Sequence, residues 1–305
     1  MTPIFEKVAL LGIGLIGSSL ALAMRRDGLA ETVTGAARSA ETRQTALDLG
    51  LVDAVFEDPI EACADADLIV LATPVGAYAD LAAKIGPTLK EGAIVTDVGS
   101  VKLAVIRDVG PHLTSGRHLV PAHPVAGSEH SGPTAGFAEL FENRYCILTP
   151  PPGCDERAVE KVAALWRACG ALVETMEPAH HDKVLAITSH LPHLIAYTIV
   201  GTATDLEKSE REEVIRYSAG GFRDFTRIAA SDPIMWRDVF LNNRDAVLEM
   251  LQRFSEDLTA LQRAIRWGEG ETLQEHFTKT RSVRRSIVEA GQAGLFDPRE
   301  PEEEG

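Results

Sequence analysis

The chain is short of cysteine and of positive charge. Its four cysteines, Cys63, Cys146, Cys154 and Cys169, show no CxxC pair and no metal-type spacing. This pattern argues against a disulfide framework or a thiolate metal site and favours reduced thiols. Lysine and arginine number 30 against 45 acidic residues, and the net charge of −15 argues against nucleic acid or an anionic membrane as a partner. An anionic small substrate stays compatible with this charge, because it needs only a few local arginines.

Long apolar segments are also lacking. No apolar run approaches the ~18 residues of a membrane span, and no signal-peptide-like apolar region precedes the first glycines. We therefore expect a cytoplasmic protein without a membrane partner. The length predicts about two domains, each able to bury its own core.

Strand and helix patterns alternate over the first half of the chain. The predicted strands cover 7–12, 32–37, 67–73, 93–99, 118–123 and 145–150, and helical patterns lie between them. This alternation predicts an α/β Rossmann-type fold, a doubly wound parallel sheet, over residues 1–177. Only helical patterns follow, so residues 178–292 are predicted to form an all-helical domain. The acidic tail 293–305 is predicted to be disordered.

A glycine-rich turn follows the first predicted strand. Gly12, Gly14 and Gly17 stand between that strand and a helix that begins at Leu15 and Ile16. In this context the glycines make the turn, admit a pyrophosphate and let the helix pack on the strand. The free N–H groups of the helix N-terminus add an anion site. The sequence therefore predicts a dinucleotide-binding site.

The end of the second predicted strand bears on the choice between NAD and NADP. NAD enzymes usually hold the ribose 2′-hydroxyl with a carboxylate here, but Ala36 and Ala37 occupy the slot, followed by Arg38 and Ser39, with Arg43 nearby. A cation and a hydroxyl suit a 2′-phosphate, so NADP is favoured and NAD stays possible. The alternative is that Arg38 is only a solvated surface residue.

Further polar residues follow three other predicted strands, where ligands of such sheets bind. They are Thr73 and Pro74; Asp97, Gly99, Ser100 and Lys102; and His123, Gly127 and Glu129. Pro124 disfavours a helix at His123 and gives its imidazole a stiff support. A hydroxyl and an imidazole at neighbouring strand ends suit proton removal from an alcohol that loses a hydride.

The helical half adds two polar groups of residues. Ser189, His190, Pro192 and His193 lie in one apolar helical pattern, and Arg223, Asp224, Arg227 and Trp236 lie in the next. Pro192 is expected to kink its helix and redirect side chains there.

These motifs together resemble one enzyme family. The set GIGLIG, ATP, DVGSVK, HPVAGSExSG, SHLPH and DFTRIAxSDPxMW is similar to the prephenate/arogenate (cyclohexadienyl) dehydrogenases of tyrosine biosynthesis, in order from about residue 6 to 290. The resemblance implies oxidative decarboxylation of prephenate or arogenate with hydride transfer to NAD(P). It also implies a homodimer paired through the helical domain, with tyrosine as a possible inhibitor. No fused chorismate mutase is present in the sequence.

The resemblance also implies roles for individual residues. His123 is the base at the ring hydroxyl, Ser100 assists there, and Gly127 makes room in the same loop. Arg227 binds a substrate carboxylate, and Glu129 with Asp224 forms an ionic gate around it. His193 lies near the substrate side chain, and Trp236 lines the same pocket.

Two other protein classes remain as alternatives. A β-hydroxyacid or imine reductase joins the same two domain types but lacks the HPxxG and DFTRI motifs, and Lys183 is a poor candidate for its lysine base. A non-catalytic redox sensor would need neither His123 nor Arg227. The adjacent His180 and His181 with Asp182 could suggest a metal, but helix capping by Asp182 or nearby groups is favoured. His190 is assigned to a buried structural hydrogen bond, and no metal is predicted. The sequence does not separate prephenate from arogenate.

Overall fold

The computed structural model describes residues 2–128, 130–205, 213 and 216–289. Contacts divide the chain into two compact units, Met1–Leu248 and Glu249–Gly305. Glu129 and the predicted disordered tail lie outside the described residues. The predicted domain boundary near residue 177 stays a prediction.

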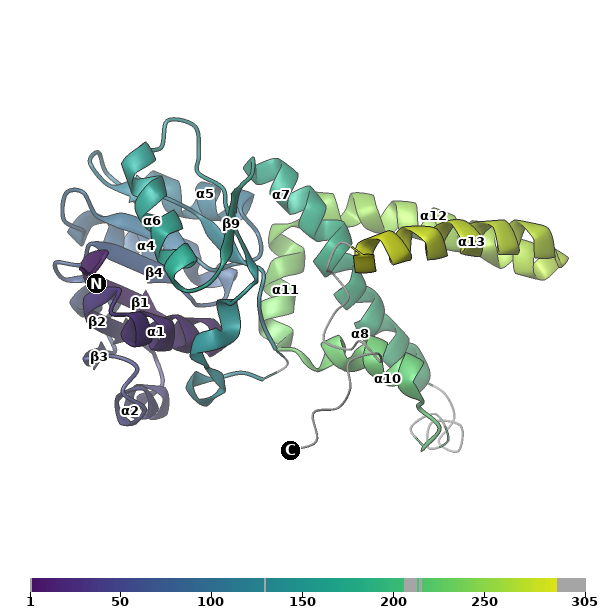
Figure 1. The fold of residues 1–305 in the computed structure, drawn as a ribbon, viewed down its shortest axis with the longest axis horizontal. Coiled ribbons are helices and arrows are strands. Elements are labelled where there is room, and N and C mark those ends of the chain that lie inside the picture. Colours follow the sequence, from purple (N-terminus) through teal and green to yellow (C-terminus); the bar gives the residue numbers. More distant parts are fainter. Residues whose placement is uncertain (1, 129, 206–212, 214–215, 290–305) are drawn as a thin grey trace. The chain divides into compact units, whose positions relative to one another are not determined.

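The first unit is built on a six-stranded parallel sheet with the order β3-β2-β1-β4-β5-β6 (Figure 1). Its strands are β1 (Phe5–Leu11), β2 (Ala30–Ala36), β3 (Ala54–Phe56), β4 (Leu68–Leu71), β5 (Ile94–Asp97) and β6 (His118–Leu119). The helices that follow these strands are α1 (Leu15–Asp27), α2 (Ala40–Asp48), α3 (Pro59–Cys63), α4 (Tyr78–Ile85) and α5 (Leu103–Val109). The predicted Rossmann-type sheet is confirmed.

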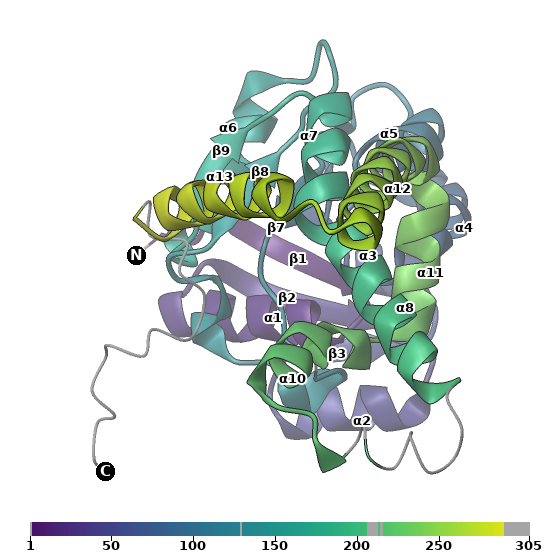
Figure 2. The ribbon, with the colours of Figure 1, turned by 90° about the vertical axis from the view of Figure 1, so that its right-hand side faces the viewer.

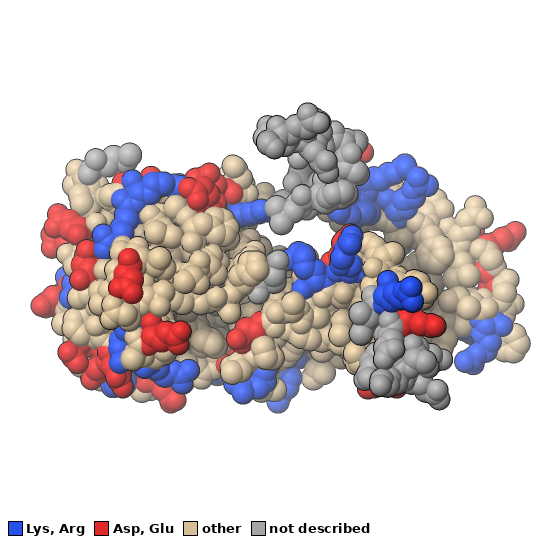
Figure 3. Space-filling view, turned by 90° about the horizontal axis from the view of Figure 1, so that it is seen from below, with Lys and Arg blue, Asp and Glu red and all other residues tan. Residues whose placement is uncertain are grey.

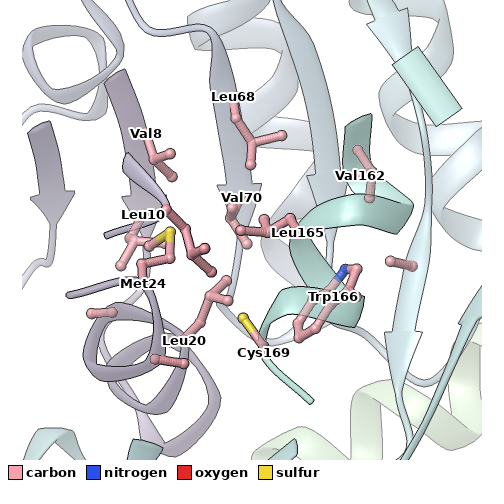
Figure 4. Close-up of a cluster of buried hydrophobic side chains, with 14 of the residues drawn as sticks. Val8, Leu10, Leu20, Met24, Leu68, Val70, Val162, Leu165, Trp166 and Cys169 are labelled. Atoms are coloured by element: carbon pink, nitrogen blue, oxygen red, sulfur yellow. The ribbon is translucent and has the colours of Figure 1, made fainter. Parts of the chain in front are cut away.

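Both faces of the sheet are buried, because alternate residues of each strand point to opposite sides. Figure 4 shows one face, where residues of β1 and β4 meet α1 and α6 (Glu156–Ala168); the labelled side chains are Val8, Leu10, Leu20, Met24, Leu68, Val70, Val162, Leu165, Trp166 and Cys169. On the other face, Ala9, Leu11, Ile69 and Leu71 pack with residues of α3, α4 and α5. This two-sided burial explains the continuous apolar runs in the sequence.

A second, smaller sheet carries the strand of His123. Its order is β7-β8-β9, with β7 (Ala122–Pro124) antiparallel to β8 (Tyr145–Leu148) and β8 parallel to β9 (Leu172–Thr175). The single strand predicted over 118–123 is therefore wrong, since β6 and β7 belong to different sheets. Pro121 lies between them, and proline has no N–H for a continued ladder. Its carbonyl instead accepts from the Thr149 N–H at 2.9 Å.

The described residues after 177 contain helices and no strand, as the sequence predicts. They form α7 (Pro178–Leu185), the π-helical segment η6 (Ala186–His190), α8 (Leu191–Thr204), α10 (Gly220–Thr226), the 3₁₀ turn η7 (Arg227–Ala230), α11 (Pro233–Asn242), α12 (Arg244–Trp267) and α13 (Gly270–Glu289). The irregularity expected at Pro192 takes the form of η6, which ends directly before α8. A π segment admits an extra residue, and such segments often lie at functional sites.

The segment Pro178–Thr204 is long and apolar enough to cross a membrane, with a mean hydropathy of 1.4. The expectation that no such run exists is therefore wrong by length and composition. His181, Asp182 and His190 interrupt the run in the sequence, although all three are buried in the structure. Only 28% of the apolar window is buried, so much of this helix surface is open in the single chain.

Charged side chains are spread over the surface. On the face drawn in Figure 3, Lys and Arg of the described residues are interspersed with Asp and Glu.

Candidate active site

The glycine loop between β1 and α1 has the geometry that a dinucleotide needs. Gly12 has φ +105°, and a Cβ there would lie 2.6 Å from the Ala72 carbonyl oxygen. A Cβ at Gly17 would overlap the carbonyl oxygen of Gly12, so only glycine lets α1 approach this closely. A Cβ at Gly14 would meet nothing within 4 Å, which leaves space at the N-terminus of α1. The loop therefore fits a pyrophosphate, with the first N–H groups of α1, from Leu15 and Ile16, free to bind it.

The residues after β2 divide into structural and available groups. Arg43 donates to the carbonyl oxygens of Ala37 and Arg38 at 2.7 and 2.8 Å and pairs with Glu57 at 2.9 Å, so it braces the loop. Ser39 caps α2 by accepting from the Thr42 N–H at 3.3 Å. Arg38 is exposed, and its guanidinium has no hydrogen bond or ion pair among the described residues. Arg38 and the Ser39 hydroxyl hydrogen are thus the donors left for a ligand.

The ends of β4 and β5 lie beside the glycine loop and β7. A Cβ at Gly12 would lie 2.8 Å from the Thr73 backbone nitrogen, and the buried Thr73 Oγ1 has no hydrogen-bond partner among the described residues. Pro74 follows as an exposed residue. Ser100 is partly exposed and lies three residues after Asp97, the last residue of β5. The carboxylate of Asp97 accepts from the N–H of Ala122, the residue before His123, so the end of β5 lies beside β7.

His123 is only 7% exposed and belongs to a chain of hydrogen-bonded side chains. Its Nδ1 lies 2.9 Å from Nε2 of His181, and Nδ1 of His181 lies 2.8 Å from Oδ1 of Asp182. A carboxylate only accepts, so His181 donates from Nδ1 to Asp182, and its Nε2 accepts when the ring is neutral. His123 must then donate from Nδ1, which leaves a lone pair on its Nε2. The network thus selects the tautomer that a base at Nε2 requires.

Burial keeps these imidazoles neutral. Burial, followed by the charges of His181, Lys102 and His190, holds the pKa of His123 well below its usual range. Burial likewise lowers the pKa of His181, and it lowers the pKa of His190 to about 4. His123 is therefore unprotonated at neutral pH, as a general base must be.

Asp182 joins this network to a second element. Its two carboxylate oxygens accept from the backbone N–H groups of Lys102 and Leu103 at 2.7 and 2.9 Å, at the start of α5. The capping expected of Asp182 or nearby groups comes from a nearby group, since Glu177 caps α7 by accepting from the His180 N–H at 2.7 Å. His181 and Asp182 are site residues that the sequence interpretation missed. The adjacent His181 and Asp182 were visible in the sequence, but their place at a helix start favoured capping, and only the structure shows that both are buried.

His190, His193 and Trp236 form an aromatic cluster between η6, α8 and α11, which lie side by side in Figure 2. His190 is fully buried and its Nδ1 lies 3.0 Å from Nδ2 of Asn243, the structural hydrogen bond expected of it. His193 stacks on Trp236 with ring centroids 3.7 Å apart, and its Nδ1 donates to the Ser189 carbonyl. The buried Nε1 of Trp236 has no partner among the described residues. A free lone pair on His193 and a free donor on Trp236 therefore stand together.

The predicted carboxylate anchor and gate are only partly described. Arg227 in η7 is exposed, and its charge helps lower the pKa of His193, after burial. Asp224 pairs with Arg223 at 3.4 Å, and both side chains are 74% exposed. Glu129 lies outside the described residues, so the gate stays a prediction. Gly127 is exposed, and a Cβ there would meet nothing within 4 Å.

Within the described ranges no three His, Cys, Asp or Glu residues gather in a way that could hold a metal ion. A nicotinamide held by the glycine loop would lie at the carboxyl ends of the parallel strands, where such sheets bind ligands. Strand β7 of the smaller sheet brings His123 to the same place, since the Ala122 N–H donates to Asp97 at the end of β5. The fold and this site define a dehydrogenase that uses a nicotinamide cofactor.

Comparison with known proteins specifies the family. Two family models match, prephenate dehydrogenase nucleotide-binding domain over residues 20–175 and prephenate dehydrogenase dimerization domain over residues 177–279. The chain belongs to the prephenate dehydrogenase family.

Individual relatives agree with this assignment. The chain is 42% identical to the cyclohexadienyl dehydrogenase of Zymomonas mobilis, covering 93% of this chain and 97% of the relative. It is 33% identical to the prephenate dehydrogenase of Bacillus subtilis, covering 94% and 77%. Among solved structures, the prephenate dehydrogenase of A. aeolicus in complex with hydroxyphenyl propionate and NAD+ is 36% identical, with a TM-score of 0.86 over 92% of this chain and 98% of that one.

Proposed function

We propose that this protein catalyses the oxidative decarboxylation of prephenate, arogenate or both, in tyrosine biosynthesis. The observation that carries the proposal is the buried His123 with its lone pair on Nε2. The names of the relatives support the substrate class. A β-hydroxyacid or imine reductase and a non-catalytic redox sensor are disfavoured, because neither requires this base.

The chemistry follows from the substrate and from these residues. When bound, a nicotinamide cofactor accepts the hydride from the ring carbon that bears the hydroxyl. Nε2 of His123 takes the hydroxyl proton as that carbon becomes a carbonyl. The carboxylate on the opposite ring carbon leaves as CO2, and its bonding electrons make the ring an aromatic phenolate. The imidazolium of His123 can return the proton, which gives 4-hydroxyphenylpyruvate or tyrosine.

Substrate binding is assigned to the helical half. The guanidinium of Arg227 suits a substrate carboxylate, and Ser100 suits the ring hydroxyl beside His123. Nε2 of His193 and Nε1 of Trp236 are an acceptor and a donor for the substrate side chain. The acceptor on His193 suits the ammonium group of arogenate, and the donor on Trp236 suits the keto oxygen of prephenate, so this pair does not select between the two substrates.

A steady-state assay with both substrates and both cofactors tests the proposal. We expect substrate-dependent reduction of the cofactor with release of CO2. No reduction with either substrate would contradict the proposed function.

We further propose that NADP is the favoured cofactor. Arg38 has no partner among the described residues, and Ala37 replaces the carboxylate that would repel a 2′-phosphate. Arg43 supports the loop rather than the ligand, since its guanidinium is already bonded. The A. aeolicus structure contains NAD+, so NAD remains the alternative cofactor for this protein.

The cofactor proposal has a direct test in a paired substitution. Ala37→Asp with Arg38→Ala should move the ratio of the two kcat/KM values by about ten- to a hundredfold toward NAD. Arg43→Ala serves as a control that weakens the loop for both cofactors alike. Preference of the unmodified enzyme for NAD would contradict the proposal.

We also infer a cytoplasmic homodimer. The open apolar surface of Pro178–Thr204 includes Ile187 and Ile199, and the helices after residue 248 expose Trp267 and Phe277. Burial of such surface against a second copy is the usual remedy. Sedimentation at micromolar concentration should give the mass of a dimer, and a monomer would contradict the inference.

Tyrosine, as the product or a relative of the product, is proposed to occupy the substrate site. Calorimetry that detects no tyrosine binding would count against this.

A further inference from the structure

A buried ion pair lies behind the two proposed catalytic residues. Asp97 ends β5, Lys102 precedes α5, and both side chains are fully buried with Nζ and Oδ2 2.6 Å apart. Removing two charges from water costs much of what their attraction returns, so a buried pair is a weak stabiliser by itself. The groups that the pair binds point to another role.

The pair binds both backbone groups of Ala122, the residue before His123. Asp97 Oδ1 accepts from the Ala122 N–H at 3.2 Å, and Lys102 Nζ donates to the Ala122 carbonyl at 2.6 Å. Strand β7 is an edge strand whose ladder to β8 uses the carbonyl of Pro121 and the N–H of Val125. Ala122 therefore faces away from β8, where its polar groups would otherwise be unpaired. The ion pair therefore supplies the two hydrogen bonds that a neighbouring strand would make to Ala122.

The same carboxylate binds the residue before Ser100. Asp97 Oδ2 accepts from the Gly99 N–H at 2.8 Å. One ion pair thus binds the backbone of Gly99 and of Ala122, the residues that immediately precede the proposed hydroxyl and the proposed base. Ser100 follows a strand of the large sheet, whereas His123 lies in the small one.

We propose that the Asp97–Lys102 pair positions Ser100 and His123 relative to each other for catalysis. The inference rests on the proposed function of these two residues. The pair joins β5 of the large sheet to β7 of the small one, and it touches neither Ser100 nor His123 by a side-chain hydrogen bond that the structure records.

The charge of Lys102 has a second effect on the base. The titratable and charged groups around His123 are His181 and Asp182 on α7, His190 in η6, Asp97 at the end of β5, Lys102 before α5, and Cys146 on β8. Among them, the cation of Lys102 disfavours protonation of His123. Loss of that cation should raise the pKa of His123, so the acidic limb of the kcat profile should move to higher pH.

Two variants test the proposal. Lys102→Met removes the cation and both of its hydrogen bonds, and the double variant Asp97→Asn with Lys102→Met also removes the carboxylate that would be left unpaired. We expect kcat to fall by about ten- to a hundredfold in both, the usual cost of a misplaced group, with the dissociation constant of the cofactor nearly unchanged. In Lys102→Met the acidic limb should also shift upward. Val162→Ala truncates a buried core residue of α6 and is the control. It should lower stability without lowering kcat and without shifting the acidic limb.

The outcomes separate this inference from the proposed function. A double variant that folds and keeps wild-type turnover and pH profile would overturn it, and so would a double variant that fails to fold, because the pair would then be structural. Titration of the His123 imidazole by NMR in wild type and Lys102→Met reads the same coupling without any substrate. An upward pKa shift there supports the pair's effect on His123 even if no substrate is turned over, and an unchanged pKa overturns it.

Discussion

The hydrogen bond from His123 to His181 fixes the tautomer that His123 needs to act as a base. Because its Nδ1 is engaged by His181, only Nε2 is available for a substrate proton. His123→Asn should therefore lower kcat by roughly 10²–10⁴, the range for a lost general base, while cofactor binding is retained. Steady-state kinetics and cofactor titration measure the two quantities. His112→Asn, outside the site, should be silent, and near-normal turnover of His123→Asn would contradict the assignment.

His181 offers a sharper test, since its immediate neighbour is a matched control. His181→Asn removes the acceptor that orients His123, so we expect kcat to fall by about tenfold or more with little change in KM. His180 is exposed, and His180→Asn should leave kcat unchanged. Equal kinetics in the two variants would show that the hydrogen bond to His123 is dispensable.

Arg227 should affect substrate rather than cofactor. Loss of a charge-assisted contact with a carboxylate is expected to raise the KM for prephenate or arogenate by about ten- to a hundredfold. Arg223 lies one helical turn away and is equally solvent-facing, so Arg223→Ala is the control. An unchanged KM in Arg227→Ala would remove Arg227 from the substrate site.

At the scale of elements, the turn between β1 and α1 separates two roles of glycine. Gly14 is open in the protein alone, so Gly14→Ala should fold normally but weaken cofactor binding by about five- to a hundredfold as its methyl group meets the ligand. Gly17→Ala forces α1 away from Gly12 and should lower the free energy of unfolding by about 1–3 kcal/mol as well. Thermal unfolding and cofactor titration distinguish the two. Equal loss of stability in both variants would contradict this division.

Elements whose cause is local could be predicted from the sequence. The glycine turn, the buried parallel strands and the helical second half each follow from neighbouring residues. The extended backbone at His123 follows from Pro124, although His123 lies within β7 and not at the end of a strand over 118–123. The split between β6 and β7 was missed because an apolar run does not reveal which sheet it joins. The contact between His123 and His181 was missed because it joins residues 58 positions apart, through a rotamer that only the packed α7 defines.

The buried histidines should make the whole molecule sensitive to acid. His123, His181 and His190 have a lowered pKa in the folded state, with burial as the main cause. Below about pH 6.5 the unfolded chain binds more protons than the folded one, so the free energy of unfolding falls as the pH decreases. Each such group contributes up to about 1.4 kcal/mol per pH unit below about pH 6.5, and for His190 this continues down to its folded-state pKa of about 4.

Denaturant unfolding at a series of pH values measures this slope. His190→Gln should reduce it by about a third, since one titrating group is lost. His276→Gln, on the exposed face of α13, should leave it unchanged. A stability that does not vary over this range would mean that the three imidazoles are already charged in the folded protein.

The contacts of Asp182 have a consequence for recombining relatives. One carboxylate on α7 both orients the imidazole next to His123 and binds the N–H groups that begin α5. A chimera joined near residue 177, with the sheet from one parent and the helices from another, inherits its base from the first parent and the tautomer of that base from the second. Such a hybrid should keep the parental turnover only if the incoming helices supply a histidine and an aspartate at these two positions and in this order. A crossover near residue 177 therefore separates His123 from His181 and Asp182, the residues that fix its tautomer.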